Sequence, residues 1–136
     1  MDDRGYQDAL TMGKRLSKRG VNPDLLVSSP ALRALTTAQL IAAEIGYPHK
    51  GIVVDERLYA SSPDDLLAVI GALDDKLGRV MLFGHNPEFT DLARRLSGEF
   101  IDMPTCTVAE FTFDTTAWSN VGVVEPAKVE VDSPTK

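Results

Sequence analysis

The chain has 136 residues, 43% of them hydrophobic, with 14 Lys and Arg against 20 Asp and Glu for a formal net charge of −6. This length suits one compact domain with a core that needs no disulfide or metal support. Its single cysteine and two histidines form neither a disulfide nor a four-ligand zinc site, so we expect no metal and no cofactor. The acidic balance disfavours a nucleic-acid partner.

The sequence also lacks the signs of a membrane segment. No apolar run approaches the roughly 18 to 20 residues of a membrane span. Residues 1–4 form neither a basic nor an apolar leader region. We therefore expect a cytoplasmic protein without a membrane partner.

The first predicted elements are a helix, a strand and a second helix. From residue 5 to residue 20 apolar side chains recur every three or four positions, which indicates an amphipathic helix with a cationic C-terminal end. The apolar run 24–29 lies between prolines and indicates a buried strand. Ser29 is expected to cap, and Pro30 to open, a helix that ends before Gly46.

The alternation of strands and helices continues along the chain. The pattern predicts a strand at 52–54, a helix that starts at residue 62 and ends before Gly78, a buried strand at 79–83 and a capped helix over 86–98. Later residues show the alternation typical of edge or antiparallel strands. The fold class is therefore α/β, a three-layer α/β/α sandwich around a mostly parallel sheet. We expect one domain over residues 1–131 and a frayed tail at 132–136.

Two strand-to-helix junctions carry residues suited to an anion, and ligands in open α/β sheets gather at such junctions. With Ser29 as cap, Arg33 lies about one turn into its helix, where the macrodipole disfavours a cation unless an anion lies beside it. The alternative is that Arg33 reaches solvent or pairs with a carboxylate such as Glu56.

The second junction places His85 between a buried strand and a capped helix. Gly84 allows a close approach to the backbone, and the start at Asn86 and Pro87 leaves N–H groups able to face an anion. His85 could donate to phosphate oxygens, or it could be a packed histidine bonded to a backbone carbonyl. Arg33 and His85 together suggest a phosphate pocket.

The residues of these junctions resemble a known family. Residues 26–38 and 83–87 resemble two blocks of the histidine phosphatase superfamily, and residues 3–9 resemble the opening of its first long helix. Spacing and order are most similar to the small SixA-like phosphohistidine phosphatases. The resemblance implies a phosphoglycerate mutase-like fold and a hydrolase that acts on phosphohistidine through a phosphohistidine enzyme intermediate.

The resemblance also implies roles for individual residues. Arg33 and His85 would bind the phosphoryl oxygens and stabilise the transition state, and the backbone N–H of Asn86 would face the phosphate. Glu56 lies where related phosphatases and mutases often place a proton-donating carboxylate, although it could equally be a solvated carboxylate at a strand end.

The sequence departs from the family at its nucleophile, a histidine in an N-terminal Arg-His-Gly motif that this chain does not contain. The strand that should precede Asp2 at the centre of the sheet is missing too. His49 is interpreted as a solvated loop histidine. We favour an omitted N-terminal segment over a degenerate family member, because loss of a central strand would expose its neighbours.

Three functions stay open on these grounds. The leading hypothesis is a phosphatase acting on phosphohistidine of a protein or on a small phosphorylated substrate. The second is a non-catalytic phosphate-binding pseudophosphatase or partner-docking module. The third is a small-molecule phosphomonoesterase or mutase-like enzyme, in which Glu56 would matter more because an alkoxide leaving group needs a proton. The sequence leaves the oligomeric state open.

Overall fold

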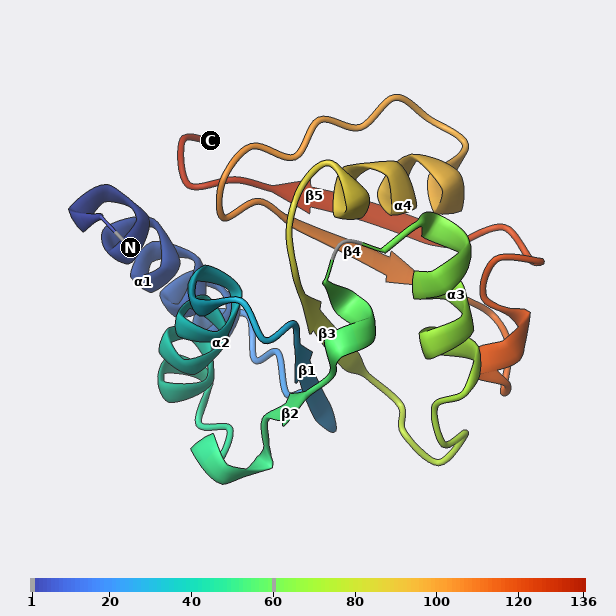
Figure 1. Ribbon diagram of the computed structural model, residues 1–136, viewed down its shortest axis with the longest axis horizontal. Helices are drawn as coiled ribbons and strands as arrows, with labels where there is room; N and C mark the ends of the chain where they lie inside the picture. The colour runs from blue at the N-terminus through green and yellow to red at the C-terminus, as the bar shows by residue number, and fades with distance from the viewer. Residues whose placement is uncertain (1, 60) are drawn as a thin grey trace.

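The computed structural model describes residues 2–59 and 61–136. Helices and strands alternate along most of the chain (Figure 1). In chain order, with η for a 3-10 helix, they are α1 (Asp3–Lys18), β1 (Leu25–Ser28), α2 (Leu32–Ile45), η1 (His49–Gly51), β2 (Val53–Val54), η2 (Glu56–Leu58), α3 (Pro63–Gly71), β3 (Val80–Phe83), α4 (Glu88–Ser97), β4 (Val108–Thr112), η3 (Trp118–Asn120) and β5 (Lys128–Asp132). The α/β class is confirmed.

A parallel sheet with the order β2–β1–β3 organises the fold. β1 pairs with β3 from Leu25 beside Val80 to Ser28 beside Phe83. The resemblance implied a further strand at the centre of this sheet. Among the described residues, β1 and β3 instead pair directly and β1 is the middle strand.

Helices cover both faces of the sheet. Successive residues of β1 point to opposite faces, so each of them contacts a different layer of helices. Leu26 belongs to a core cluster with α1 and α2, whereas Val27 belongs to a cluster with α3 and α4. The predicted α/β/α layering is therefore confirmed. None of the helices in the described parts of the chain is both long and apolar enough to cross a membrane.

The start of α3 agrees with the prediction, but its end does not. Ser62 and Asp65 form a capping box, each side chain accepting from the backbone N–H of the other residue. The helix ends at Gly71 and not at Leu77, because the backbone turns at Asp74, whose carbonyl accepts from the Leu77 N–H. The Leu77 carbonyl in turn accepts from Trp118 Nε1 at 3.0 Å.

The predicted cap of α2 is wrong. The helix begins at Leu32, Ala31 is its N-cap, and no side chain caps it. Ser29 lies earlier, still aligned with the sheet, because its N–H donates to the Phe83 carbonyl of β3 at 2.9 Å. Arg33 consequently lies at the very start of α2 instead of one turn into it.

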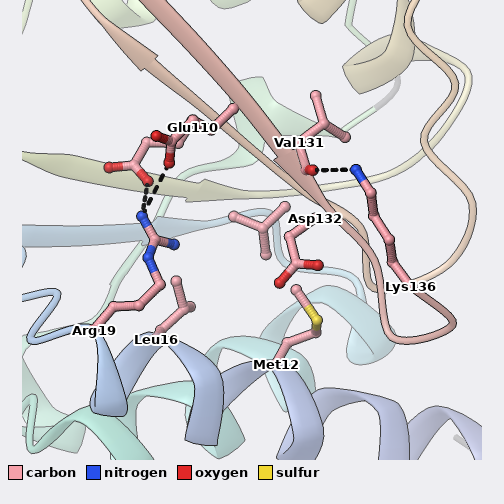
Figure 2. A pocket seen from close by; sticks show the side chains of 9 residues that line it. Met12, Leu16, Arg19, Glu110, Val131, Asp132 and Lys136 are labelled. Carbon is pink, nitrogen blue, oxygen red and sulfur yellow. Dashed lines mark hydrogen bonds and ion pairs between the residues drawn. The ribbon is translucent and has the colours of Figure 1, made fainter.

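β4 and β5 form a separate antiparallel pair, which confirms the antiparallel prediction. A cavity of about 390 Å³ separates this pair from α1, with Met12 and Leu16 of α1 on one side and Val131 of β5 on the other. Figure 2 shows Arg19, the residue directly after α1, reaching to Glu110 of β4, where the guanidinium donates to the carboxylate at 2.7 Å. Polar contacts thus bridge the two parts.

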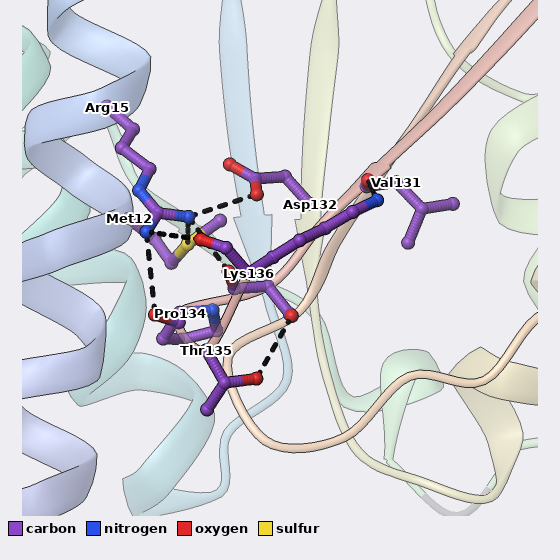
Figure 3. Close-up of polar contacts among 8 residues, drawn as sticks. Met12, Arg15, Val131, Asp132, Pro134, Thr135 and Lys136 are labelled. Atoms are coloured by element: carbon purple, nitrogen blue, oxygen red, sulfur yellow. Dashed lines mark hydrogen bonds and ion pairs between the residues drawn. The ribbon is translucent and has the colours of Figure 1, made fainter.

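Arg15 of α1 holds the residues around the end of β5. Arg15 Nη1 donates to Asp132 Oδ1 at 3.0 Å and to the Ser133 carbonyl at 2.8 Å. Its Nη2 donates to the carbonyls of Pro134 and Lys136 at 3.4 and 3.2 Å (Figure 3). These contacts give residues 133–136 a defined place beside α1.

Candidate functional site

The three parallel strands end side by side, and two backbone hydrogen bonds extend their alignment beyond the sheet. The N–H of Asp55, directly after β2, donates to the Ser28 carbonyl at 2.9 Å. The N–H of Ser29, directly after β1, donates to the Phe83 carbonyl at the same distance. The loops that carry the predicted site residues therefore leave from one edge of the sheet, where ligands bind in open α/β folds.

Ser29 and His85 meet at this edge. Ser29 Oγ lies 3.1 Å from His85 Nε2. Ser29 is fully buried, whereas His85 is half-buried. Their meeting follows from the strand register, because Ser28 and Phe83 are paired and these two residues come one and two positions later.

Tyr59 is a neighbour of His85 that the sequence did not predict. The two rings lie edge to face, with centroids 5.6 Å apart and planes at 90°. Tyr59 directly follows η2 and remains 56% exposed. No local pattern signals this contact, because it depends on where η2 lies relative to β3.

Arg33 and Glu56 are both exposed. Among the ion pairs of the described residues there is none between them, so the alternative pairing of Arg33 with Glu56 is not observed. The first turn of α2 contains no acidic residue, which leaves Arg33 at the positive end of the helix dipole without a carboxylate from its own turn. The guanidinium and the positive end of the helix dipole thus lie together at the start of α2.

The carboxylate next to Glu56 does have a partner. Arg57 Nη2 donates to Asp55 Oδ2 at 2.6 Å, and Arg57 Nε donates to both carboxylate oxygens. These side-chain hydrogen bonds hold the pKa of Asp55 below its usual range. Asp55 is therefore committed to Arg57 at this edge of the sheet.

The side chain of Asn86 binds to Thr90 of α4 and to the loop after α4. Its Oδ1 accepts from the backbone N–H and the hydroxyl of Thr90, at 3.2 and 2.7 Å, and its Nδ2 donates to the Met103 carbonyl. The backbone N–H of Asn86 has no hydrogen-bond partner among the described residues. It is this backbone group that the resemblance expects to face phosphate.

Gly84 makes room for a side chain of the protein itself. A Cβ at this position would lie 2.3 Å from Cε1 of the Phe89 ring. The close approach that the sequence suggested at Gly84 is thus an approach by Phe89, which follows one turn later on α4.

The other histidine lies elsewhere. His49 is exposed in η1, where its Nε2 is 3.4 Å from Gln39 Nε2 of α2. Since η1 leads into β2, it lies toward the amino ends of the parallel strands, opposite the edge that carries His85 (Figure 1). His49 is a surface residue, as the sequence indicated.

The chain is similar in sequence to known proteins. The family model described as Histidine phosphatase superfamily (branch 1) matches residues 1–59. An uncharacterized protein of Mycobacterium leprae is 27% identical over 106 residues, which cover 70% of this chain and 66% of that protein. The chain thus spans somewhat less than two thirds of this curated relative.

Solved structures share the fold. A structure named for the phosphohistidine phosphatase SixA of Nakamurella multipartitia superposes with a TM-score of 0.80 at 22% identity, covering 100% of this chain and 85% of that one. A protein histidine phosphatase SixA complexed with tungstate gives 0.84 at 22% identity, covering 99% and 84%. One named for SixA of Agrobacterium tumefaciens gives 0.67 at 27% identity, covering 73% and 62%. The family model thus matches the first 59 residues of the chain, and the solved structures share its fold.

Proposed function

We propose that this protein is a SixA-type phosphatase that removes a phosphoryl group from phosphohistidine of a protein, through a phosphohistidine enzyme intermediate. One observation carries the proposal: the parallel register of β1 and β3 sends the loops that carry Arg33 and His85 out of one sheet edge. The similar SixA structure that holds tungstate supports it, because tungstate is a tetrahedral oxyanion like phosphate.

The residues at this edge supply the binding side of such a site. Arg33 would pair with phosphoryl oxygens and offset the charge that spreads over them in the transition state. His85 and the free backbone N–H of Asn86 would donate to the same oxygens. The family assigns the attack on phosphorus to a histidine in an Arg-His-Gly motif, which is not among the 136 residues of this chain.

The leaving group decides the weight of Glu56. When the nucleophile forms its N–P bond, the N–P bond of the substrate breaks and the electron pair stays on the substrate imidazole, which solvent can protonate. A phosphate ester instead releases an alkoxide, which needs a positioned acid. Glu56 is exposed, so we assign it the role of general acid only for ester substrates.

A second candidate is a non-catalytic phosphate-binding module. The position of His49, at the far end of the strands from His85, favours it. Such a module would bind inorganic phosphate saturably without forming a phosphoenzyme.

The test combines binding and turnover. Inorganic phosphate binding is measured by calorimetry, and release of phosphate is followed from a phosphohistidine protein and from an aryl phosphate. We expect His85→Ala and Arg33→Ala to weaken phosphate binding about tenfold or more, which corresponds to about 1.4 kcal/mol. His49→Ala and Arg95→Ala are matched controls with the same residue changes on exposed surfaces.

The outcomes separate the candidates. Turnover with a trapped phosphoenzyme, reduced in both site variants, supports the phosphatase. Saturable binding without turnover supports the binding module, and loss of ester hydrolysis alone in Glu56→Gln supports a small-molecule phosphomonoesterase. Undiminished binding and turnover in both site variants would sink the assignment of Arg33 and His85.

A further inference from the structure

The contact between Ser29 and His85 constrains the protonation of the His85 ring as well as its position. Ser29 is fully buried, so water does not reach its hydroxyl. A serine hydroxyl has one hydrogen to donate and two lone pairs to accept with. The partners of this hydrogen and of the two lone pairs decide which nitrogen of His85 carries a proton.

One lone pair of Ser29 Oγ is already used. The backbone N–H of Ala31 donates to it at 3.3 Å, and His85 Nε2 lies on the other side at 3.1 Å. Among the described residues, no other group is within hydrogen-bonding reach of this hydroxyl. The neighbouring Ser28 hydroxyl donates to the Ser29 carbonyl and leaves Ser29 Oγ untouched.

Two arrangements of the proton are possible. If Nε2 carried the hydrogen, it would donate to Ser29 Oγ, both lone pairs would be used, and the buried Ser29 hydrogen would have no acceptor. If Nε2 is bare, the Ser29 hydroxyl donates to it and every group is satisfied. Burying an unpaired donor is costly, whereas the second arrangement leaves nothing unpaired.

We propose that Ser29 is a positioning residue that holds His85 as the neutral Nδ1–H tautomer. Nδ1 has no hydrogen-bond partner among the residues that the structure describes, and the ring is only half-buried. The ring of Tyr59 lies perpendicular to that of His85, with centroids 5.6 Å apart. Nδ1–H is therefore the donor that His85 presents to an anion.

This inference deepens the proposed function, and its last step rests on it. If the site binds phosphate, the phosphoryl oxygen accepts from Nδ1–H while the Ser29 hydroxyl keeps Nε2 occupied. Ser29 itself does not touch the phosphate. It acts through His85. The hydrogen bond made by one ring nitrogen of a histidine commonly sets whether the other nitrogen carries the proton.

The tautomer can be measured without any activity. Long-range proton–nitrogen NMR spectra of the 15N-labelled protein at neutral pH distinguish the two tautomers by the couplings of Nδ1 and Nε2. The chain has only two histidines, so exposed His49 serves as an internal reference in the same spectrum. We expect the Nδ1–H pattern for His85, and an Nε2–H pattern in the unmodified protein would overturn the proposal.

Variants test the role of Ser29. Ser29→Ala should shift His85 toward the Nε2–H tautomer, whereas Ser28→Ala, an equally buried neighbour, should leave it unchanged. Retention of the Nδ1–H tautomer in a folded Ser29→Ala protein would contradict the assignment. If Ser29→Ala does not fold, the spectrum of the unmodified protein decides alone.

Inorganic phosphate separates this inference from the proposed function. If both hold, added phosphate shifts the Nδ1 resonance of His85 and leaves that of His49 in place. If the Nδ1–H tautomer is present but phosphate shifts neither histidine, the positioning role of Ser29 stands and the phosphate site fails. If phosphate binds while His85 is the Nε2–H tautomer, the proposed function stands and the role of Ser29 fails.

Discussion

The sheet edge around Ser29 and the contact between α1 and the β4–β5 pair are held together in different ways. At the sheet edge, adjacent parallel strands exchange backbone hydrogen bonds, and Ser28 and Ser29 are fully buried. Between α1 and the strand pair, ion pairs cross a cavity, and the side chains of Arg15 and Asp132 are 34% and 37% exposed. Exposed ion pairs contribute little to stability, whereas burial contributes much.

This difference explains where a binding site can be accurate. Groups that must meet an anion within a few tenths of an ångström need neighbours that do not shift. The ends of β1 and β3 provide such neighbours, because their backbone hydrogen bonds fix one loop relative to the other. The contact between α1 and the β4–β5 pair carries none of the candidate site residues.

The largest expected effect comes from the core beneath the sheet edge. Leu26 of β1 is fully buried, and Leu26→Ala should lower the free energy of unfolding by about 2–5 kcal/mol because it leaves a cavity. Urea denaturation measures this loss. Leu32→Ala is the control, since Leu32 is 73% exposed; equal losses in the two variants would remove the distinction between buried and exposed parts of this region.

The next effect sharpens the comparison at the site itself. Gly84→Ala should cost about 1–3 kcal/mol, because the new methyl group would push against the Phe89 ring. Gly71→Ala is a matched control, since the nearest atom to its added Cβ is the Ser119 Cα at an ordinary 3.6 Å. Thermal unfolding compares the two, and a stabilised Gly84→Ala protein would show that Phe89 moves freely.

A smaller loss is expected between α1 and the strand pair. Arg15→Met keeps the aliphatic stem but removes the hydrogen bonds to Asp132 and to the carbonyls after it. It should cost roughly 0–1 kcal/mol, with less cost in about 1 M salt. Arg4→Met is the control on the same helix, because the Arg4 side chain is 79% exposed. A loss as large as that of Leu26→Ala would break the comparison.

The smallest effect concerns an ion pair at the sheet edge. Arg57 lowers the pKa of Asp55 chiefly through its side-chain hydrogen bonds, so the pair stabilises the folded protein above the unfolded-state pKa of Asp55. This contribution is lost as the pH falls through the lower, folded-state value. Arg57→Ala should therefore be slightly destabilising at pH 7 and indistinguishable from the unmodified protein in strong acid.

NMR titration of the Asp55 carboxyl carbon checks this directly. We expect its midpoint to move up in Arg57→Ala and to stay in place in Arg95→Ala, which removes an arginine that pairs with Asp64 instead. An Asp55 titration midpoint that stays unchanged in Arg57→Ala would mean that the pair does not persist in solution. The exposure of the Asp55–Arg57 pair would then matter more for its stability than its position at the sheet edge.

The sequence predicted the elements whose signals are local. The Ser62 cap, the glycine after α2 and the order of strands and helices depend on neighbouring residues and were recognisable. The start of α2 was not, because Ser29 is held by a carbonyl of β3, far along the chain. A local capping preference yields when a tertiary hydrogen bond competes for the same residue.

For the candidate site, too, the sequence predicted the residues with local signals and missed the contacts between distant parts of the chain. The rule that ligands gather at strand ends placed Arg33 and His85 at corresponding junctions. The contacts of Ser29 and Tyr59 with His85 were missed, because they depend on strand register and on the position of η2. Arg15 of α1 donates hydrogen bonds to residues within 132–136, far along the chain, and no local pattern predicts these contacts.

The bond from Trp118 to the Leu77 carbonyl gives the molecule an optical reporter. Trp118 is the only tryptophan, and it packs on the core cluster of α3 and α4, on the other side of the sheet from α1 and α2. Its fluorescence therefore follows the unfolding of one layer, while the resonances of His85 follow the sheet edge. Denaturation curves from the two signals that coincide would mean that both layers unfold as one cooperative unit.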